Sequence, residues 1–371
     1  MIIGTVKEIK NHEYRVGITP DNVKEYIKHG HTVLIETHAG EGANYKDQDY
    51  INAGAIILNN AKEVYEKAEM IVKVKECLKE EFDYLKQGQI LYTYLHLAAN
   101  KEFADILIKK GVTAVAYETI EDKIGNLPCL RPMSEIAGRL SIQEGAKYIE
   151  STFGGKGILL GGVPGVERGN IVIIGGGIVG TYAAKAAVGT GAKVTVIDKN
   201  LNRLVYLDDI FGASITTLYS SETNIEKSLL EADLVIGAVL IPGDKAPKLI
   251  KEDYVKKMKK GAVIVDIAID QGGISETSSV TTHDDPIYIK HNVVHYCVGN
   301  MPGAVPYTST IALTNVTLNY GLLIADNGIK KACKLNNGLA KGVNIFDGKC
   351  VNENVAKALD YNYVDINKVL E

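Results

Sequence analysis

The sequence predicts an α/β protein made of two doubly wound parallel-sheet domains with a cleft between them. The chain has 371 residues, 46% of them hydrophobic, which is enough to bury two ordinary cores. Short β-rich runs alternate with amphipathic segments in two separate series. Such alternation is typical of a mostly parallel sheet with helices on both faces.

The first series runs from Met1 to about Ile120. Helices are expected between its strands, and Gly30 and Gly111 stand where helices commonly end in glycine. The six predicted strands of this series are IIGTV (2–6), TVLIE (32–36), AIIL (55–58), MIVKV (70–74), QILYTYL (89–95) and TAVAYE (113–118).

The pattern breaks in NLPCLRPMSE, residues 126–135. Pro128 and Pro132 exclude a regular element there, and Ser134 is placed to cap a helix over residues 135–150. We therefore expect the chain to cross from one domain to the other in this segment.

The second series contains as many strands as a full dinucleotide-binding fold requires. A long helix is expected over residues 307–328, and the remaining residues hold too few strands for a third domain, so they should dock on one of the first two. The predicted strands are NIVIIGGG (170–177), AKVTVID (192–198), ASITTLY (213–219), ADLVIGAV (232–239), GAVIVDIAI (261–269) and NVVHYCVG (292–299).

Composition favours a small-molecule partner in a reducing compartment. The net charge is -4 without a basic block, which argues against nucleic acid or an anionic membrane as partner. No signal peptide or membrane span is evident, so a cytoplasmic location is expected. The cysteines form no C-x-x-C pair, which argues against disulfides and structural zinc; they are Cys77, Cys129, Cys297, Cys333 and Cys350.

A glycine-rich motif predicts a Rossmann-like NAD site. Residues Gly175–Gly180 read G-x-G-x-x-G, follow an apolar strand and open a helix, so backbone N–H groups can meet a pyrophosphate. Asp198 ends the next strand, where a carboxylate binds ribose hydroxyls and repels the 2′-phosphate of NADP. The alternative for Asp198 is a turn or cap residue. Arg203 is the kind of residue that an NADP enzyme would use.

Acidic and basic side chains follow other predicted strands. Asp270 closes the run at residues 261–270, where ligands gather in α/β sheets, or it is a turn residue before Gly272. Counting by twos puts Asp266 on the same face as Ile264, Ala268 and Asp270, and Asp266 is expected to be a buried, hydrogen-bonded acid. Lys73 and Lys75 share a face near a strand end, where they bind a carboxylate or are simply solvated.

Arg15 and His96 complete the candidates of the first series. Arg15 precedes a helix that begins near Pro20, and its planar fork suits a small carboxylate, although a surface salt bridge is an equal alternative. The segment around His96, taken alone, is typical of a core histidine. If it is catalytic, Leu95 and Leu97 should anchor its loop and partly desolvate the imidazole. His291 and His295 lack a third ligand, so no zinc site is expected.

Over nearly its full length the chain resembles the alanine dehydrogenase family. The resemblance rests on the following segments: KEIKNHEYRVGITP, IVKVKE, TYLHLAA, RPMSEIAGRLS, GGVPGV, the glycine motif with Asp198, VLIPGDKAPKL, VIVDIAIDQGG and NMPGAVPYTSTIALTN. It implies reversible, NAD-dependent oxidative deamination of L-alanine to pyruvate and ammonium by a homohexamer. It also implies a substrate domain of residues 1–128 and 307–371 and an NAD domain of residues 129–306.

The resemblance also implies roles for individual residues. Arg15 and Lys75, with Asn300, would hold the substrate, and His96 and Asp270 would be the acid/base pair. The implied NAD site comprises Ser134, Gly175, Gly177, Ile178, Val179, Gly180, Asp198, Arg203, Ser220, Val239, Leu240, Ile267, Ala268, Ile269, Asp270, Val298, Gly299, Asn300 and Met301.

Some positions depart from the family pattern. Cys77 replaces a usual proline and Gly299 a common alanine, which affects loop rigidity more than chemistry. Leu323 and Asn327 stand at positions that bind metal in some members, so no metal is predicted. Two alternatives are a soluble NAD(H)-binding subunit of a proton-translocating transhydrogenase and a non-catalytic NAD-binding protein. The joint presence of Arg15, Lys75, His96 and Asp270 favours the dehydrogenase.

Overall fold

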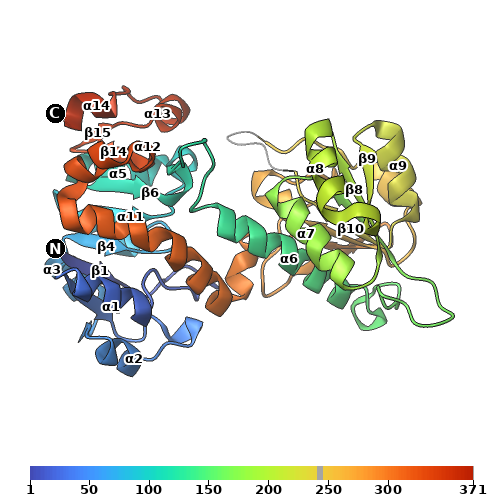
Figure 1. Ribbon diagram of the computed structural model, residues 1–371, viewed down its shortest axis with the longest axis horizontal. Helices are drawn as coiled ribbons and strands as arrows, with labels where there is room; N and C mark the ends of the chain where they lie inside the picture. Colours follow the sequence, from blue (N-terminus) through green and yellow to red (C-terminus); the bar gives the residue numbers. More distant parts are fainter. Residues whose placement is uncertain (240–244, 371) are drawn as a thin grey trace. The chain divides into compact units, whose positions relative to one another are not determined.

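The computed structural model describes residues 1–239 and 245–370, and these residues form two compact units (Figure 1). The first unit comprises Met1–Pro132 with residues 305–370, and the second comprises Met133–Ala304. Each unit has its own sheet, flanked by helices. The predicted fold class, two Rossmann-like α/β units, is confirmed.

The first unit contains a sheet with the strand order β15-β14-β6-β5-β4-β1-β2-β3. Strands β1 to β6 are parallel, whereas β14 and β15 add antiparallel pairs beyond β6. The order reverses between β1 and β4, which makes this edge a topological switch point. The strands are β1 (Ile2–Thr5), β2 (Thr32–Glu36), β3 (Ile56–Leu58), β4 (Met70–Val72), β5 (Ile90–Thr93), β6 (Thr113–Ala116), β14 (Val343–Phe346) and β15 (Lys349–Cys350).

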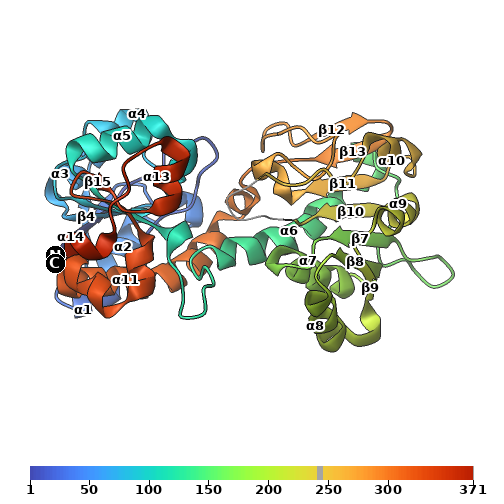
Figure 2. The same ribbon diagram turned by 90° about the horizontal axis from the view of Figure 1, so that it is seen from above.

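Helices cover both faces of this sheet. Figure 2 shows α3, α4 and α5 along one face and α1, α2 and α11 along the other. Thr19 caps α1 in a capping box, and Gly111 ends α5 with a φ of 65°, as predicted. The helices are α1 (Pro20–Lys28), α2 (Asp47–Asn52), α3 (Ala61–Lys67), α4 (Lys79–Phe82), α5 (Lys101–Lys110), α11 (Pro306–Leu335), α12 (Asn337–Gly342), α13 (Glu353–Leu359) and α14 (Ile366–Leu370).

The second unit contains a sheet with the order β12-β13-β11-β10-β7-β8-β9. All neighbouring pairs are parallel except β12 with β13. Without β12, this is the dinucleotide-binding strand order, with its switch point between β7 and β10. The strands are β7 (Asn170–Ile174), β8 (Lys193–Asp198), β9 (Thr216–Tyr219), β10 (Leu234–Gly237), β11 (Val263–Asp266), β12 (Ile287–Lys290) and β13 (Val293–Tyr296).

The helices of the second unit are α6 (Arg131–Tyr148), α7 (Ile178–Gly189), α8 (Leu201–Phe211), α9 (Glu222–Glu231) and α10 (Glu252–Lys257). Helices α6 and α7 touch closely, since a Cβ at Gly138 would lie 2.3 Å from the Val179 carbonyl oxygen. The glycine of RPMSEIAGRLS is therefore needed for helix packing.

Every strand predicted for the two series has a counterpart in the structure, but four local predictions are wrong. Helix α6 begins at Arg131, so Ser134 lies inside it and does not cap it. The expectation that Pro132 excludes a regular element is wrong as well, because Pro132 lies in the first turn of α6, where an N–H needs no partner. The predicted strand at residues 261–269 ends at Asp266, and Asp270 lies in a 3₁₀ helix, Ile267–Gln271, so the face shared by Asp266 and Asp270 does not exist. Helix α11 continues to Leu335, interrupted by non-helical Gly328.

All five cysteines are free thiols, as predicted, and all five are buried. Across residues 1–239 and 245–370, no helix is both long and apolar enough to cross a membrane.

Candidate active site

The glycine loop after β7 uses each motif glycine for a different reason. Gly175 has a φ of 107°, and a Cβ there would lie 2.6 Å from the Ala238 carbonyl oxygen. A Cβ at Gly180 would lie 1.8 Å from the Gly175 carbonyl oxygen, so α7 packs against the loop only with glycine. Gly177 is exposed at the start of α7 and has open space around its Cβ position. The loop therefore leaves the amino end of α7 accessible to a phosphate.

Asp198 and Arg203 brace this loop from the next strand and helix. One Asp198 carboxylate oxygen accepts from the Gly176 N–H at 2.6 Å, and the other accepts from the Asn200 N–H at 2.7 Å. Arg203 donates to the Gly176 carbonyl oxygen at 2.8 and 3.0 Å and to Thr181 Oγ1 at 2.8 Å. Asp198 thus makes the contact of a turn residue, which was the alternative to a cofactor role, in addition to its contact with the glycine loop. The Arg203 guanidinium is engaged by the protein itself.

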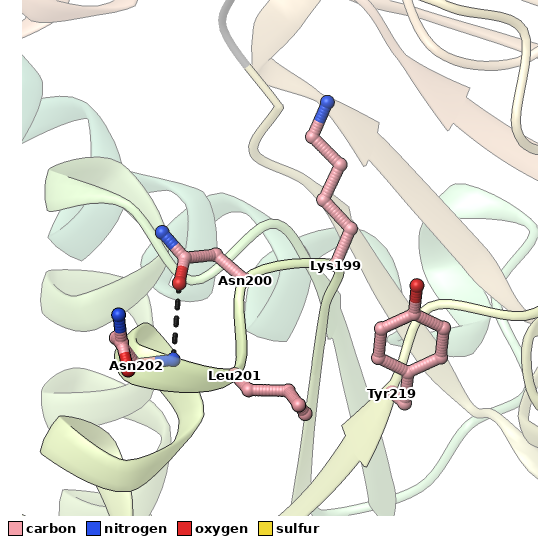
Figure 3. A pocket seen from close by; sticks show the side chains of 5 residues that line it. All are labelled: Lys199, Asn200, Leu201, Asn202 and Tyr219. Carbon is pink, nitrogen blue, oxygen red and sulfur yellow. Dashed lines mark hydrogen bonds between the residues drawn. The ribbon is translucent and has the colours of Figure 1, made fainter.

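An open pocket of about 540 Å³ lies directly beyond Asp198 (Figure 3). Its lining comes from the ends of β8 and β9 and the start of α8, and consists of Lys199, Asn200, Leu201, Asn202 and Tyr219. The Asn200 side chain caps α8 by accepting from the Asn202 N–H at 3.0 Å. This is the position at which the adenosine end of a dinucleotide lies in folds of this order.

The other residues predicted for the NAD site follow the carboxyl ends of parallel strands in the second unit. Ser220 follows β9 and donates its N–H to the Asp198 carbonyl oxygen at 3.0 Å. Val239 follows β10, residues 267–270 follow β11, and residues 298–301 follow β13. Ile178 and Val179 open α7, whereas Ser134 lies in the first turns of α6. Leu240 lies outside the described residues.

Asp266 and Asp270 have different surroundings. Asp266 is buried and accepts from the Ile274 N–H at 2.9 Å and from Ser278 Oγ at 2.6 Å, and burial raises its pKa. The expectation of a buried, hydrogen-bonded acid is correct. Asp270 is exposed, and a Cβ at Gly299 would lie 2.9 Å from its Oδ1. The structure therefore brings Asp270 close to Gly299, the residue before Asn300.

In the first unit, Arg15 forms a buried ion pair with Glu13. The guanidinium Nε and Nη2 each donate to a Glu13 carboxylate oxygen at 2.6 Å, and Arg15 is 2% exposed. The alternative of a surface salt bridge is therefore wrong. Burial raises the pKa of the Glu13 carboxyl, but the bonds and charge of Arg15 outweigh this effect and hold the pKa below its usual range.

Lys73 and Lys75 follow β4 but do different things. Lys73 is fully buried, with its Nζ 2.7 Å from a Glu81 oxygen and 3.3 Å from a Glu8 oxygen, so it is not solvated. Burial and the neighbouring Arg15 charge lower the pKa of Lys75, against the opposing charge of Glu13. Among the groups that act on Lys75, the cations Arg15 and Lys10, with Lys75 itself, face the two carboxylates Glu13 and Glu76. This positive excess favours an anionic ligand.

His96 is not a core residue. Its side chain is exposed although Leu95 and Leu97 are buried, so the expected partial desolvation is absent. The ring stacks on Tyr94 with centroids 5.9 Å apart and planes at 13°. The Tyr94 hydroxyl donates to the Cys129 carbonyl oxygen at 2.6 Å. The apolar neighbours anchor the loop, as predicted, but leave the imidazole accessible.

Arg15, Lys75 and His96 follow β1, β4 and β5, at the carboxyl edge of one sheet. The charge of Arg15 also acts on the hydroxyl of Tyr94, which stacks on His96; burial raises the pKa of Tyr94 and Arg15 opposes that rise. That these residues share a cleft with Asp270 and Asn300 stays a prediction. Sequence reasoning missed Glu8 and Glu13, although both lie within the segment KEIKNHEYRVGITP that contains Arg15. Within the described ranges, no group of three metal-ligating side chains could hold a metal ion.

Two units with the dinucleotide-binding strand order, one carrying the glycine loop and the other a cationic edge with an accessible histidine, define a dinucleotide-dependent dehydrogenase. Residues 4–137 match the N-terminal domain of alanine dehydrogenase/PNT, and residues 141–353 match its C-terminal domain. The chain belongs to the alanine dehydrogenase/PNT family and is an oxidoreductase.

Relatives extend this result over the whole chain. The alanine dehydrogenase of Methanococcus maripaludis is 57% identical over 371 residues, covering 100% of both chains. A solved L-alanine dehydrogenase matches with a TM-score of 0.95 and 51% identity, over 97% of this chain and 99% of that one. A solved transhydrogenase from Sinorhizobium meliloti has a TM-score of 0.82 at 21% identity, over 95% and 99% of the two chains, and shows the shared fold alone.

Proposed function

We propose that this protein catalyses the reversible NAD-dependent oxidative deamination of L-alanine to pyruvate and ammonium. The observation that carries the proposal is the end-to-end similarity to an alanine dehydrogenase, at 57% identity, in a chain that contains Arg15, Lys75, His96 and Asp270. The proposed substrate domain is residues 1–128 with 307–371, and the proposed NAD domain is residues 129–306.

NAD is the proposed cofactor because the contacts of Asp198 and Arg203 favour it over NADP. The Asp198 carboxylate accepts from backbone N–H groups and has lone pairs left for ribose hydroxyls, and its charge repels a 2′-phosphate. Arg203 is already bonded to the Gly176 carbonyl oxygen and to Thr181, which opposes a role in binding that phosphate. Bound NAD supplies the nicotinamide that accepts the hydride from Cα of alanine.

In the proposed mechanism, the positive excess of Arg15 and Lys75 binds the alanine carboxylate and, in the reverse direction, polarises the pyruvate carbonyl. The ammonium group of alanine gives up a proton, loss of hydride from Cα of the resulting amine leaves an iminium, and water attacks the iminium to give a carbinolamine. His96 takes the proton of the attacking water and returns one to the departing ammonia, because its exposed imidazole can both accept and donate a proton. Asp270 relays protons and stabilises the developing positive charge. Asn300 and residues 267–270 and 298–301 hold the nicotinamide end.

The test is an assay of the purified protein in both directions. Alanine and NAD should produce NADH, and pyruvate with ammonium should consume it. Absence of both activities in protein that still binds NADH would contradict the proposal. Hydride exchange between two nicotinamide nucleotides in that same protein would support the transhydrogenase alternative instead.

We also propose that the protein works in the cytoplasm as a homohexamer, the assembly that the family resemblance implies. Its buried free thiols fit a reducing compartment. Light scattering coupled to size-exclusion chromatography tests the assembly, and a mass of one or two chains would contradict it.

A further inference from the structure

The backbone of His96 is held in an uncommon conformation. Its φ of 47° and ψ of 36° lie in the left-handed region, which a residue with a Cβ adopts only when its surroundings stabilise it. His96 is the first residue of the turn that leads into Leu97–Ala99, and it is exposed although Leu95 and Leu97 on either side of it are buried. An extended backbone at this position would direct the imidazole elsewhere.

The stabilising group is the Glu118 carboxylate. Glu118 lies just after β6, which runs parallel to β5 with Ala116 opposite Thr93. Its Oε1 accepts from the His96 N–H at 2.6 Å and from the Leu95 N–H at 3.1 Å, and its Oε2 is 3.3 Å from the same Leu95 nitrogen. The Glu118 carboxylate thus accepts hydrogen bonds from two successive N–H groups that lie beyond the end of β5. Successive N–H groups at a left-handed residue form a concavity that suits an anion.

Resting on the proposed function, we propose that Glu118 is a positioning residue for His96. It fixes the backbone from which the imidazole stacks on Tyr94 and stays accessible to a substrate. Glu118 acts through main-chain bonds and makes no proton transfer itself. The half-buried carboxylate also gains from the bonds, because charge-assisted hydrogen bonds are stronger than neutral ones.

Two variants separate the effect of the length of the Glu118 side chain from the effect of its charge. Glu118→Gln keeps one acceptor oxygen but replaces the other with a donor, and Glu118→Asp keeps the charge but shortens the side chain by one carbon. Both should lower kcat by about 10- to 100-fold, as expected for a misplaced catalytic group, while the dissociation constant for NADH stays within about twofold of wild type. Glu121→Gln is the control, since Glu121 lies three residues further on and pairs with Lys341 at 2.6 Å. Its kcat should equal that of wild type.

A second measurement does not depend on turnover. In protein labelled with ¹⁵N-histidine, the His96 amide signal should shift in both Glu118 variants, whereas the signals of most of the other histidines stay in place. In the wild-type protein, the His96 amide should exchange slowly with solvent although the side chain is exposed. An unmoved and fast-exchanging His96 amide would overturn the proposal, as would a near-normal kcat in both variants. If the wild type lacks alanine turnover, the proposed function fails, but the amide signals still decide the role of Glu118.

Discussion

Substitution of three glycines in the loop and helix after β7 should separate effects on folding from effects on cofactor binding. Gly180→Ala would put a Cβ 1.8 Å from the Gly175 carbonyl oxygen, where ordinary van der Waals contacts begin at 3.4 Å. The carbonyl oxygen belongs to the backbone of the loop, and the added Cβ is fixed to the backbone of α7. Neither atom can rotate away, so α7 must move away from the loop. Overpacking of this kind costs about 1–3 kcal/mol, so the free energy of unfolding should fall by that amount.

Gly177→Ala should affect binding without affecting folding. A Cβ there meets no atom within 4 Å, so the free energy of unfolding should change by less than about 1 kcal/mol. The methyl group would stand at the exposed start of α7, where the pyrophosphate is proposed to approach the backbone. A penalty of about 1–3 kcal/mol would weaken NADH binding by roughly 5- to 150-fold. Gly180→Ala should weaken NADH binding to a similar extent, because it displaces the same loop.

Gly189→Ala is the matched control in the same helix. Its Cβ would also meet no atom within 4 Å, and Gly189 is the last residue of α7, far from the loop. It should leave NADH binding unchanged and stabilise the helix by up to about 1 kcal/mol. Chemical denaturation and NADH fluorescence titration measure both quantities. If Gly180→Ala matched Gly189→Ala in both, the packing argument would fail, and normal NADH binding by Gly177→Ala would refute the pyrophosphate position.

The remaining predictions concern chemistry. His96→Ala and Asp270→Asn should each lower kcat by about 10²–10⁴-fold with little change in NADH affinity, and near-normal rates in both would contradict their proposed roles. Asp198→Ala should raise the kcat/KM for NADP relative to NAD, because a repelling charge is removed; an unchanged ratio would count against its ribose role. Burial and Arg15 lower the pKa of Lys75, so it loses its charge at a lower pH than an ordinary lysine. The KM for pyruvate should therefore rise in the alkaline range, and more weakly in Lys75→Arg; a flat wild-type KM would refute this.

The strands could be predicted because their information is local. Runs such as Ile171–Ile174 and Val263–Val265 are apolar, β-branched and bounded by turn residues. The antiparallel strands β14 and β15 could not be predicted in this way, because β14 forms by pairing with β6, more than two hundred positions earlier, and β15 then pairs with β14. The end of β11 was predicted wrongly because the sequence pattern does not mark where the backbone leaves the strand. Ile267 and Ala268 continue the apolar pattern, but the backbone turns there into a 3₁₀ helix.

The candidate site also combines features that the local sequence predicts with contacts that it does not predict. The motif around Gly175 and Asp198 is contiguous enough to predict its strand, turn and helix. The exposure of His96 depends on a left-handed backbone held by Glu118, and no pattern in the sequence marks that contact. The burial of Arg15 could have been suspected from Glu13, because an acid two residues away can share one face of an extended segment with it.

The charges along the edge of the first sheet suggest why an anion should bind at Lys75 and not at Lys73. Lys73 lies between two carboxylates, Glu8 and Glu81, so its charge is more than balanced. Burial raises the pKa of Glu8, which reduces that negative excess in part. Nearer the strand edge, Lys75 lies with Arg15 and Lys10 against Glu13 and Glu76, and the balance is positive. A partly buried cation without full compensation is unfavourable, as the lowered pKa of Lys75 indicates. A substrate carboxylate would supply the missing negative charge, so its binding energy comes partly from relieving a cost already present in the free protein.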